Sequence, residues 1–328
     1  MEFSNHVLIR DDAGDRRRVE QPEGEGAAVP VFRGAPRAGA LFACALLAIG
    51  AWTRAPAADY TWDCNTASGI QPCGGSLGDQ RFTTDGTDLV TWPGGTNTMV
   101  FAGDTGIWNI SVPSTASIGG LTVSKKGYSL TGAGMLEIAS NPANFQVDAD
   151  ISIAARLGGS GGFDKRGSGT LTLSGRNEFK GAARVSLGTL KIGNDTALGD
   201  TAGTTTIASS GTLDVNGRHL GREQLYLEGG SIVNNGAGVN VTFRRLTVRA
   251  NSTLGGTGNF GIRKADDANS ALRVDAGATL VKLDSNTFLL GGLPVVVEGR
   301  FEVHTGTLAV WGGTIFSGAG NYLFGPGS

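Results

Sequence analysis

The sequence predicts an all-β protein folded as a right-handed parallel β-helix, in which short strands wind into stacked coils. Three observations lead to this fold class. Glycine supplies 54 of 328 residues, more than twice the usual share, without the three-residue period of collagen. The segments between glycines alternate apolar and polar residues, which is the period of a strand. A Gly-Thr-Leu triplet also returns at intervals of 19 to 28 residues.

The spacing of the triplet selects the architecture. The triplet and its close variants begin at Gly169, Gly188, Gly211, Gly230, Ser252, Ala278 and Gly306. A propeller blade needs about 40 residues or more, and a leucine-rich repeat needs a regular leucine and asparagine pattern that this chain lacks. A parallel β-helix fits because each coil uses two or three short strands, and successive coils pair strand on strand.

Elementary physics explains why such coils must stack. A single coil cannot bury its apolar face, whereas coils about 4.8 Å apart pair their backbones and share one interior. Inward positions are therefore expected to hold Leu, Val and Ile, and outward positions Thr and Ser. Glycine and asparagine are expected at corners with positive φ. The usual handedness of parallel crossovers predicts a right-handed coil.

The chain divides into three predicted regions. Residues 1–57 form a leader, residues 58–110 an N-terminal β cap, and residues 111–328 the β-helix, with its repeat core at 157–192. Short strands are predicted from Ile110 onward, within 118–123, 127–132, 134–138 and 145–153. Trp62, Trp92 and Trp108 are concentrated near the start of the mature chain. Such aromatic residues suit a cap over the end of the core, and a sugar-binding platform is the alternative.

The leader has the pattern of a secretory signal peptide. Basic residues precede an apolar run at 38–52, which is short for a membrane span, and an Ala-x-Ala site follows. Cleavage is predicted after Ala57 or Ala58. Acylation of Cys44 is disfavoured because most of the apolar run follows that residue. A twin-arginine signal at Arg16–Arg18 is disfavoured because the triplet lies far ahead of the run.

Cys64 and Cys73 flank a short loop and are predicted to form a disulfide in an oxidising compartment, with two free thiols as the alternative. Three cysteines and three histidines are too few for most metal sites, and no histidine lies near this pair. The formal net charge of −2 argues against a nucleic-acid partner, because a nucleic-acid groove requires a basic patch.

Residues 158–193 resemble the passenger-associated transport repeat, also called the autotransporter-associated β-strand repeat. The resemblance is specific over residues 60–215 and weaker beyond them. The shared positions are Gly159–Gly162, Lys165, Gly167, Gly169–Gly175, Asn177, Gly181, Val185 and Gly188–Leu190. The departures are Phe163 for Leu, Glu178 for Thr, Phe179 for Tyr, and Ala182-Ala183 for two small polar residues.

The resemblance implies an autotransporter passenger of a Gram-negative bacterium. Such a protein crosses the periplasm and ends at the cell surface or in the medium. The implied partner is an outer-membrane β-barrel translocator, which this sequence does not include. A host-cell surface, a matrix surface or a polysaccharide is the expected target.

Several acids and histidines are candidates for catalysis. Asp266-Asp267 is interpreted as a solvated corner, and Asp148 and Asp150 as outward residues at a strand edge. His219 and His304 are far apart in the sequence and are interpreted as solvated side chains. The sequence therefore predicts no catalytic, cofactor-binding or metal-binding residue, and no cofactor.

Two functions follow from these observations. The favoured hypothesis is a non-enzymatic adhesin or structural scaffold. The alternative is a β-helical polysaccharide lyase or hydrolase. Three or more acids within about 6 Å of one another, beside a basic residue in a groove, would favour the enzyme.

Overall fold

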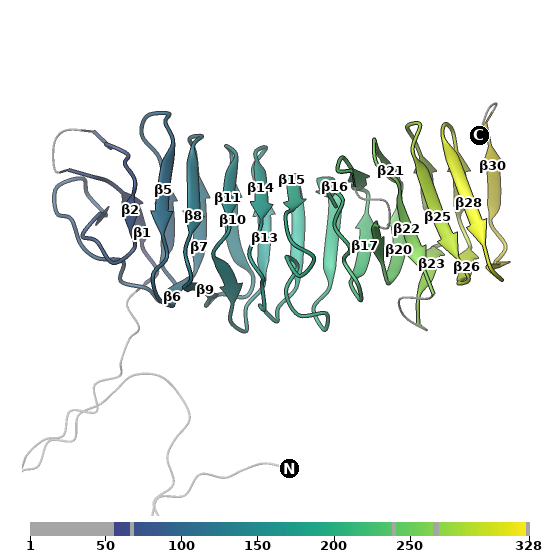
Figure 1. Ribbon diagram of the computed structural model, residues 1–328, viewed down its shortest axis with the longest axis horizontal. Coiled ribbons are helices and arrows are strands. Elements are labelled where there is room, and N and C mark those ends of the chain that lie inside the picture. Colours follow the sequence, from purple (N-terminus) through teal and green to yellow (C-terminus); the bar gives the residue numbers. More distant parts are fainter. Residues whose placement is uncertain (1–55, 66–68, 238–240, 265–268, 326–328) are drawn as a thin grey trace, which may run out of the picture. The chain divides into compact units, whose positions relative to one another are not determined.

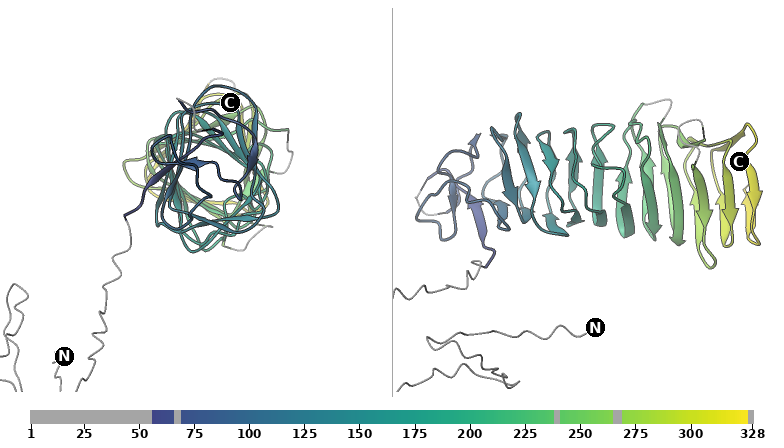
Figure 2. Two further views of the ribbon diagram at one scale, coloured as in Figure 1. Left: turned by 90° about the vertical axis from the view of Figure 1, so that its left-hand side faces the viewer. Right: turned by 90° about the horizontal axis from the view of Figure 1, so that it is seen from below.

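The computed structural model describes residues 56–65, 69–237, 241–264 and 269–325. Within the unit that begins at residue 55, the chain winds through three faces in turn, and successive coils stack along one axis (Figure 1). Seen along that axis, the coils follow one another around a common interior (Figure 2). The predictions for the apolar run 38–52, Cys44 and Arg16–Arg18 lie outside the described residues.

The first face is a ladder of parallel strands. In stacking order its strands are β1 (Asp59–Trp62), β4 (Thr98–Phe101), β7 (Gly120–Val123), β10 (Ala143–Val147), β13 (Phe163–Arg166), the first halves of β15 (Ala183–Ile192) and β16 (Thr205–Asp214), β17 (Gln224–Glu228), β20 (Arg245–Ala250), β23 (Ala271–Val274), β26 (Pro294–Val297) and β29 (Ile315–Ser317).

The second face continues from the first in nearly every coil. Its strands are β2 (Gly75–Ser76), β5 (Trp108–Ser111), β8 (Tyr128–Thr131), β11 (Ile151–Ile153), β14 (Thr170–Leu173), the second halves of β15 and β16, β18 (Ser231–Asn234), β21 (Ser252–Gly256), β24 (Thr279–Lys282), β27 (Arg300–Val303) and β30 (Asn321–Phe324).

The third face is strand at both ends and irregular in the middle. One set of strands is β6 (Ala116–Ile118), β9 (Met135–Ile138) and β12 (Arg156–Gly158). The other set is β19 (Val241–Phe243), β22 (Phe260–Arg263), β25 (Thr287–Gly291) and β28 (Thr307–Trp311). Between these sets, irregular segments continue the stacking, because Glu178 N donates to Leu157 O and Asp200 N donates to Phe179 O.

The predicted parallel β-helix is confirmed. All strand pairs are parallel except that of β1 with β3 (Phe82–Thr83), and the described residues contain no helix. Accordingly, no helix in this part of the chain has the length and apolar character that would let it cross a membrane. The right hand of the coil, expected from the crossover rule, stays a prediction.

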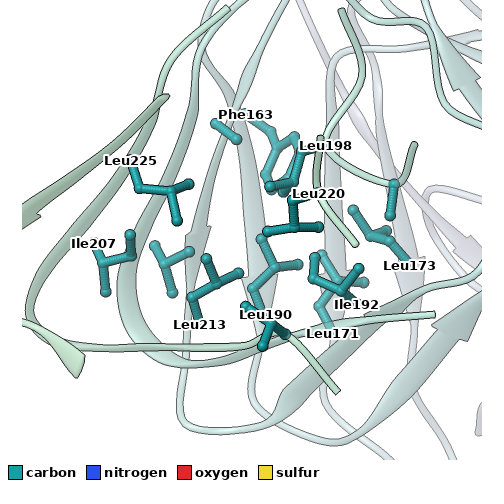
Figure 3. Close-up of a cluster of buried hydrophobic side chains, with 14 of the residues drawn as sticks. Phe163, Leu171, Leu173, Leu190, Ile192, Leu198, Ile207, Leu213, Leu220 and Leu225 are labelled. Atoms are coloured by element: carbon teal, nitrogen blue, oxygen red, sulfur yellow. The ribbon is translucent and has the colours of Figure 1, made fainter. Parts of the chain in front are cut away.

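The core is a column of apolar side chains from successive coils (Figure 3). Leu171, Leu190, Leu213, Ile232 and Leu254 follow one another in register on the second face, and each is 0% exposed. The residue before each of them is Thr or Ser, and these hydroxyl residues are partly exposed. The predicted alternation of inward and outward residues is therefore correct here.

The last two triplets depart from that column. Leu280 pairs with Ser252 instead of Leu254, and Lys282 takes the position beside Leu254. Thr307 and Leu308 lie on β28 of the third face, where they pair with Thr287 and Phe288. A triplet records a local turn and strand, which different faces can share.

Two lysines are completely buried at corners of the coil. Lys165 Nζ donates to the carbonyl oxygens of Arg166, Gly167 and Leu187 at 3.2, 2.6 and 2.9 Å. Burial lowers the pKa of Lys165 to about 8, and the charges of Asp148 and Asp150 oppose this effect. Lys165 therefore satisfies backbone carbonyl groups that the tight turn at the corner leaves unpaired.

The second lysine repeats this arrangement several coils later. Lys282 Nζ donates to the carbonyl oxygens of Leu283, Asp284 and Thr305. In both places a triplet glycine of the next coil has positive φ, and a Cβ added at Gly188 or Gly306 would lie 2.7 or 2.9 Å from the ammonium nitrogen. The triplet glycine is thus part of a corner that a buried lysine completes.

Aromatic residues cover the N-terminal end of the core. Trp62 and Phe82 are fully buried and meet edge to face with ring centroids 5.2 Å apart. Trp92 packs against Phe82 at 4.9 Å, and its Nε1 donates to Ser117 O at 2.8 Å. These contacts lie at one end of the apolar column, and the assignment of residues 58–110 as a cap stays a prediction.

A substitution at Gly188 tests the corner. A Cβ there would lie 2.5 Å from Gly167 O and 2.7 Å from Lys165 Nζ, at a φ of +71°. We expect Gly188→Ala to lower the free energy of unfolding by about 3 kcal/mol or more, measured by urea denaturation.

Gly277→Ala is the matched control, because φ is +79° there and no atom lies within 4 Å of the added Cβ. In this variant we expect the free energy of unfolding to fall by only about 1 kcal/mol, which is the cost of placing a residue with a Cβ at positive φ. Equal losses in the two variants would contradict the role assigned to the crowded corner.

Candidate functional site

The candidate site is a polar groove over the third face, in the middle of the solenoid. It has a volume of about 890 Å³. Its charged lining comes from four successive coils. These residues are Glu137, Arg156, Arg176, Glu178, Lys180 and Asp200. We call it the third-face groove.

Glycine keeps part of this groove open. Gly159 follows β12 with a φ of +93°, and a Cβ there would lie 2.8 Å from Ile138 O and 2.9 Å from Glu137 Cγ. A larger residue at this position would therefore strain the backbone and press on Glu137. The glycines that the repeat motif places at 158–162 thus leave the coil without bulky side chains at this point.

The segment 176–180 places its side chains by alternation, although it is not assigned as a strand. Asn177 and Phe179 point inward and are buried, whereas Arg176, Glu178 and Lys180 are exposed. Asn177 Oδ1 accepts from Leu157 N at 2.8 Å, and its Nδ2 donates to Ala197 O at 2.7 Å. One buried amide therefore ties three coils together beneath the groove.

The carboxylates of the groove have partners within the protein. Glu178 forms an ion pair with Arg156 at 3.9 Å, and Ser117 Oγ donates to Glu137 Oε2 at 3.3 Å. Asp200 Oδ1 accepts from Ala202 N at 2.9 Å. Among the residues that the structure describes, no hydrogen bond or ion pair engages the side chains of Arg176 and Lys180. The groove therefore has two cationic side chains without a partner among the described residues, next to acidic side chains that each have one.

A buried carboxyl group lies near the same region of the fold. Glu223 is 4% exposed. Burial raises its pKa to about 8, and the charge of Asp200 adds to this effect. The carboxyl group is therefore largely protonated at neutral pH, because its charged form is poorly solvated.

The acids considered in the sequence occupy solvated corners. Asp148 Oδ1 accepts from Gln146 Nε2 at 2.6 Å, and Asp150 Oδ1 accepts from Thr170 N at 2.8 Å. Both residues are exposed. Asp266 and Asp267 lie outside the described residues.

The two histidines are not brought together. The strands that precede His219 and His304 are β16 and β27, and β18, β21 and β24 lie between these strands in the ladder. His304 Nε2 lies 2.7 Å from Glu302 Oε2, and Arg300 contacts the other oxygen. The hydrogen bond from His304, with a smaller contribution from Arg300, holds the pKa of Glu302 below its ordinary value. Within the described ranges, no group of three or more His, Cys, Asp or Glu side chains could hold a metal ion.

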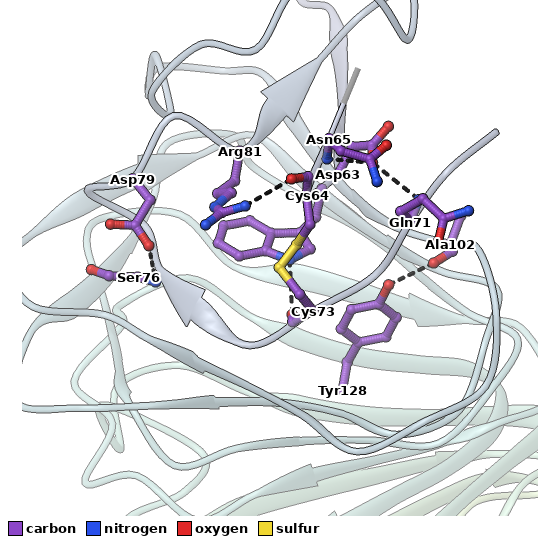
Figure 4. Close-up of a disulfide and its surroundings, with 11 residues drawn as sticks. Asp63, Cys64, Asn65, Gln71, Cys73, Ser76, Asp79, Arg81, Ala102 and Tyr128 are labelled. Atoms are coloured by element: carbon purple, nitrogen blue, oxygen red, sulfur yellow. Dashed lines mark hydrogen bonds between the residues drawn. A yellow bond between two sulfur atoms is a disulfide. The ribbon is translucent and has the colours of Figure 1, made fainter. Parts of the chain in front are cut away.

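The two cysteines are bonded within the cap (Figure 4). Cys64 and Cys73 have Cα atoms 6.0 Å apart. Trp62 Nε1 donates to Cys73 O at 3.0 Å, and Arg81 donates to Cys64 O at 2.8 Å. The loop is thus attached to the buried aromatic residues, and the oxidation state of the exported protein stays a prediction.

The predicted cleavage region adjoins the first strand. Ala58 N donates to Asn97 Oδ1, and Ala58 O accepts from Thr98 N, both at 2.9 Å. Cleavage after Ala57 would keep both interactions, whereas cleavage after Ala58 would remove them. We therefore favour the first of the two predicted positions.

Sequence reasoning missed the third-face groove. The available signal was the order Arg176-Asn177-Glu178-Phe179-Lys180, in which charged residues alternate with two residues that turn inward. Glu137, Arg156 and Asp200 could not be added from the sequence, because their approach depends on the register between coils.

The fold and the repeat resemble those of autotransporter passengers, and a known protein supports this resemblance. Over 192 residues, 56% of this chain, the sequence is 31% identical to the adhesin BmaC autotransporter of Brucella suis biovar 1 (strain 1330). The chain spans 6% of that protein's length. No family model matches the sequence, and no solved structure matches it. The predicted resemblance to autotransporter passengers is confirmed at the level of this relative.

The buried Glu223 makes stability depend on pH. The unfolded chain releases this proton near the ordinary glutamate pKa of about 4.3, whereas the folded protein holds it up to about pH 8. The stabilising contribution is therefore present below about pH 4.3 and is lost as the pH rises through 8.

We expect Glu223→Gln to raise the free energy of unfolding at pH 8 by about 2 kcal/mol, and to have much less effect at pH 5. Urea denaturation at both pH values measures this difference. Glu298→Gln is the control, because Glu298 is exposed. An effect of Glu223→Gln that is independent of pH would contradict the assignment.

The mass of the exported protein tests the processing and the disulfide together. We expect a chain that begins at Ala58 and is two hydrogens lighter than its dithiol form, because Ala58 is held by the fold and the cysteines are paired. Intact-mass spectrometry with and without reduction measures both features. A chain that begins at Asp59, or cysteines alkylated without reduction, would contradict them.

Proposed function

We propose that this chain is a non-enzymatic passenger that acts at the cell surface or after secretion, as an adhesin or a structural scaffold. One observation carries the proposal: a continuous parallel β-helix whose sequence is similar to part of an autotransporter adhesin. A stacked solenoid presents long, regular faces on a stiff support. Such faces suit contacts that are broad and individually weak.

The proposed route begins with secretion into the periplasm and removal of the leader after Ala57. An outer-membrane translocator is the proposed partner for the second crossing. The disulfide between Cys64 and Cys73 suits an oxidising compartment, since such bonds persist outside the cytoplasm. A host-cell or matrix surface is the proposed target.

Surface display tests this function. The chain would be fused to the translocator of another autotransporter and expressed in a non-adherent Gram-negative strain. We expect proteinase K added to intact cells to remove the passenger, and the strain to adhere several-fold more to cultured cells or immobilised matrix than a strain with the translocator alone.

Two results would count against the proposal. A displayed, protease-accessible passenger that gives no increase in adherence would contradict the adhesin. Release of sugar fragments from a polysaccharide panel by the purified protein would contradict the non-enzymatic assignment. Heat-unfolded protein serves as the control for sugar release.

A further inference from the structure

We propose that the third-face groove binds an acidic glycan, a polysaccharide strand that bears spaced carboxylate or sulfate groups. Arg176 and Lys180 are the side chains that meet its anionic groups. This inference rests on the proposed function and deepens it, because it names the class of molecule to which the passenger would adhere.

The acids of the groove have partners within the described part of the chain, whereas two of its cations do not. Its three acids are held by Arg156, by Ser117 and by the backbone at Ala202. Arg176 and Lys180 have no such partner among the described residues, and both are exposed. Charge-assisted hydrogen bonds to an incoming anion are therefore open to them without the loss of an interaction in the free protein.

The segment that carries the two cations is preorganised. Arg176 and Lys180 flank Asn177 and Phe179, which anchor this segment in the core. Phe179 meets Phe163 edge to face with centroids 5.4 Å apart, and Asn177 bonds to two neighbouring coils. The backbone that carries both cations is thus fixed before binding, which reduces the entropy lost on association.

The acids beside the cations restrict the kind of anion that the groove would accept. Glu137, Glu178 and Asp200 balance the formal charge of the three cations in the groove. A dense polyanion would be repelled by these acids. A glycan with spaced anionic groups also carries hydroxyl groups, which can donate to the carboxylate oxygens. The mixed lining therefore favours a sparsely charged sugar polymer over a densely charged chain.

The experiment uses the exported chain and the double variant Arg176→Gln/Lys180→Gln. Hyaluronan is the carboxylate probe and chondroitin sulfate the sulfate-bearing probe, with neutral dextran and poly-glutamate for comparison. The dissociation constants are measured by isothermal titration calorimetry. We expect the unaltered protein to bind one or both acidic glycans. In the variant we expect weaker binding, with a dissociation constant larger by about tenfold or more.

Lys125→Gln/Lys126→Gln is the matched control, because it also removes two exposed cations but lies in the turn before β8. We expect this control to bind like the unaltered protein. The thermal unfolding midpoints of both double variants should match that of the unaltered chain, so that a loss of binding reports the groove.

Three results would overturn the inference. They are no binding to either acidic glycan, equal weakening in both double variants, or binding of poly-glutamate as tight as that of the glycans. If displayed cells adhere while the groove variant adheres equally well, the proposed function stands and this site fails. If displayed cells do not adhere but the groove binds glycan, the site stands and the adhesin fails.

Discussion

Each coil of this protein depends on its neighbours for the hydrogen bonds of its strands and for the burial of its apolar side chains. Leu190 is covered only because Leu171 and Leu213 lie in register on either side of it. The interaction is local in space but crosses about twenty residues of sequence at each step. A displacement of one residue would turn these leucines toward solvent, so the register must be fixed at the corners.

The corners fix that register by satisfying backbone groups that the strands cannot reach. Lys165 and Lys282 each donate to carbonyl groups of their own corner and of the next coil. Asn177 has the same role on the third face, where regular strands are interrupted. Buried polar groups are costly unless they are paired, so these side chains specify one arrangement of coils over slipped alternatives.

The third-face groove follows from this arrangement. Where regular strands give way to irregular segments, the coil still stacks, but glycine replaces bulky side chains at its surface. Core anchors then hold the exposed charges of 176–180 at defined positions. The segment whose inward residues complete the core therefore also carries the exposed charges of the groove, and the proposed binding surface needs no separate domain.

The sequence by itself determined the fold class, because a strand period, frequent glycines and a recurring triplet satisfy few architectures other than stacked coils. It also determined the inward residues of the regular strands, such as Leu171 and Leu190, since alternation depends on neighbours in the chain. Only the tertiary structure decided that Leu308 lies on the third face and that Lys282 enters the core. It alone joined Glu137, Arg156, Arg176 and Asp200 in one groove. These placements depend on the number of residues in each corner, and contacts between coils set that number.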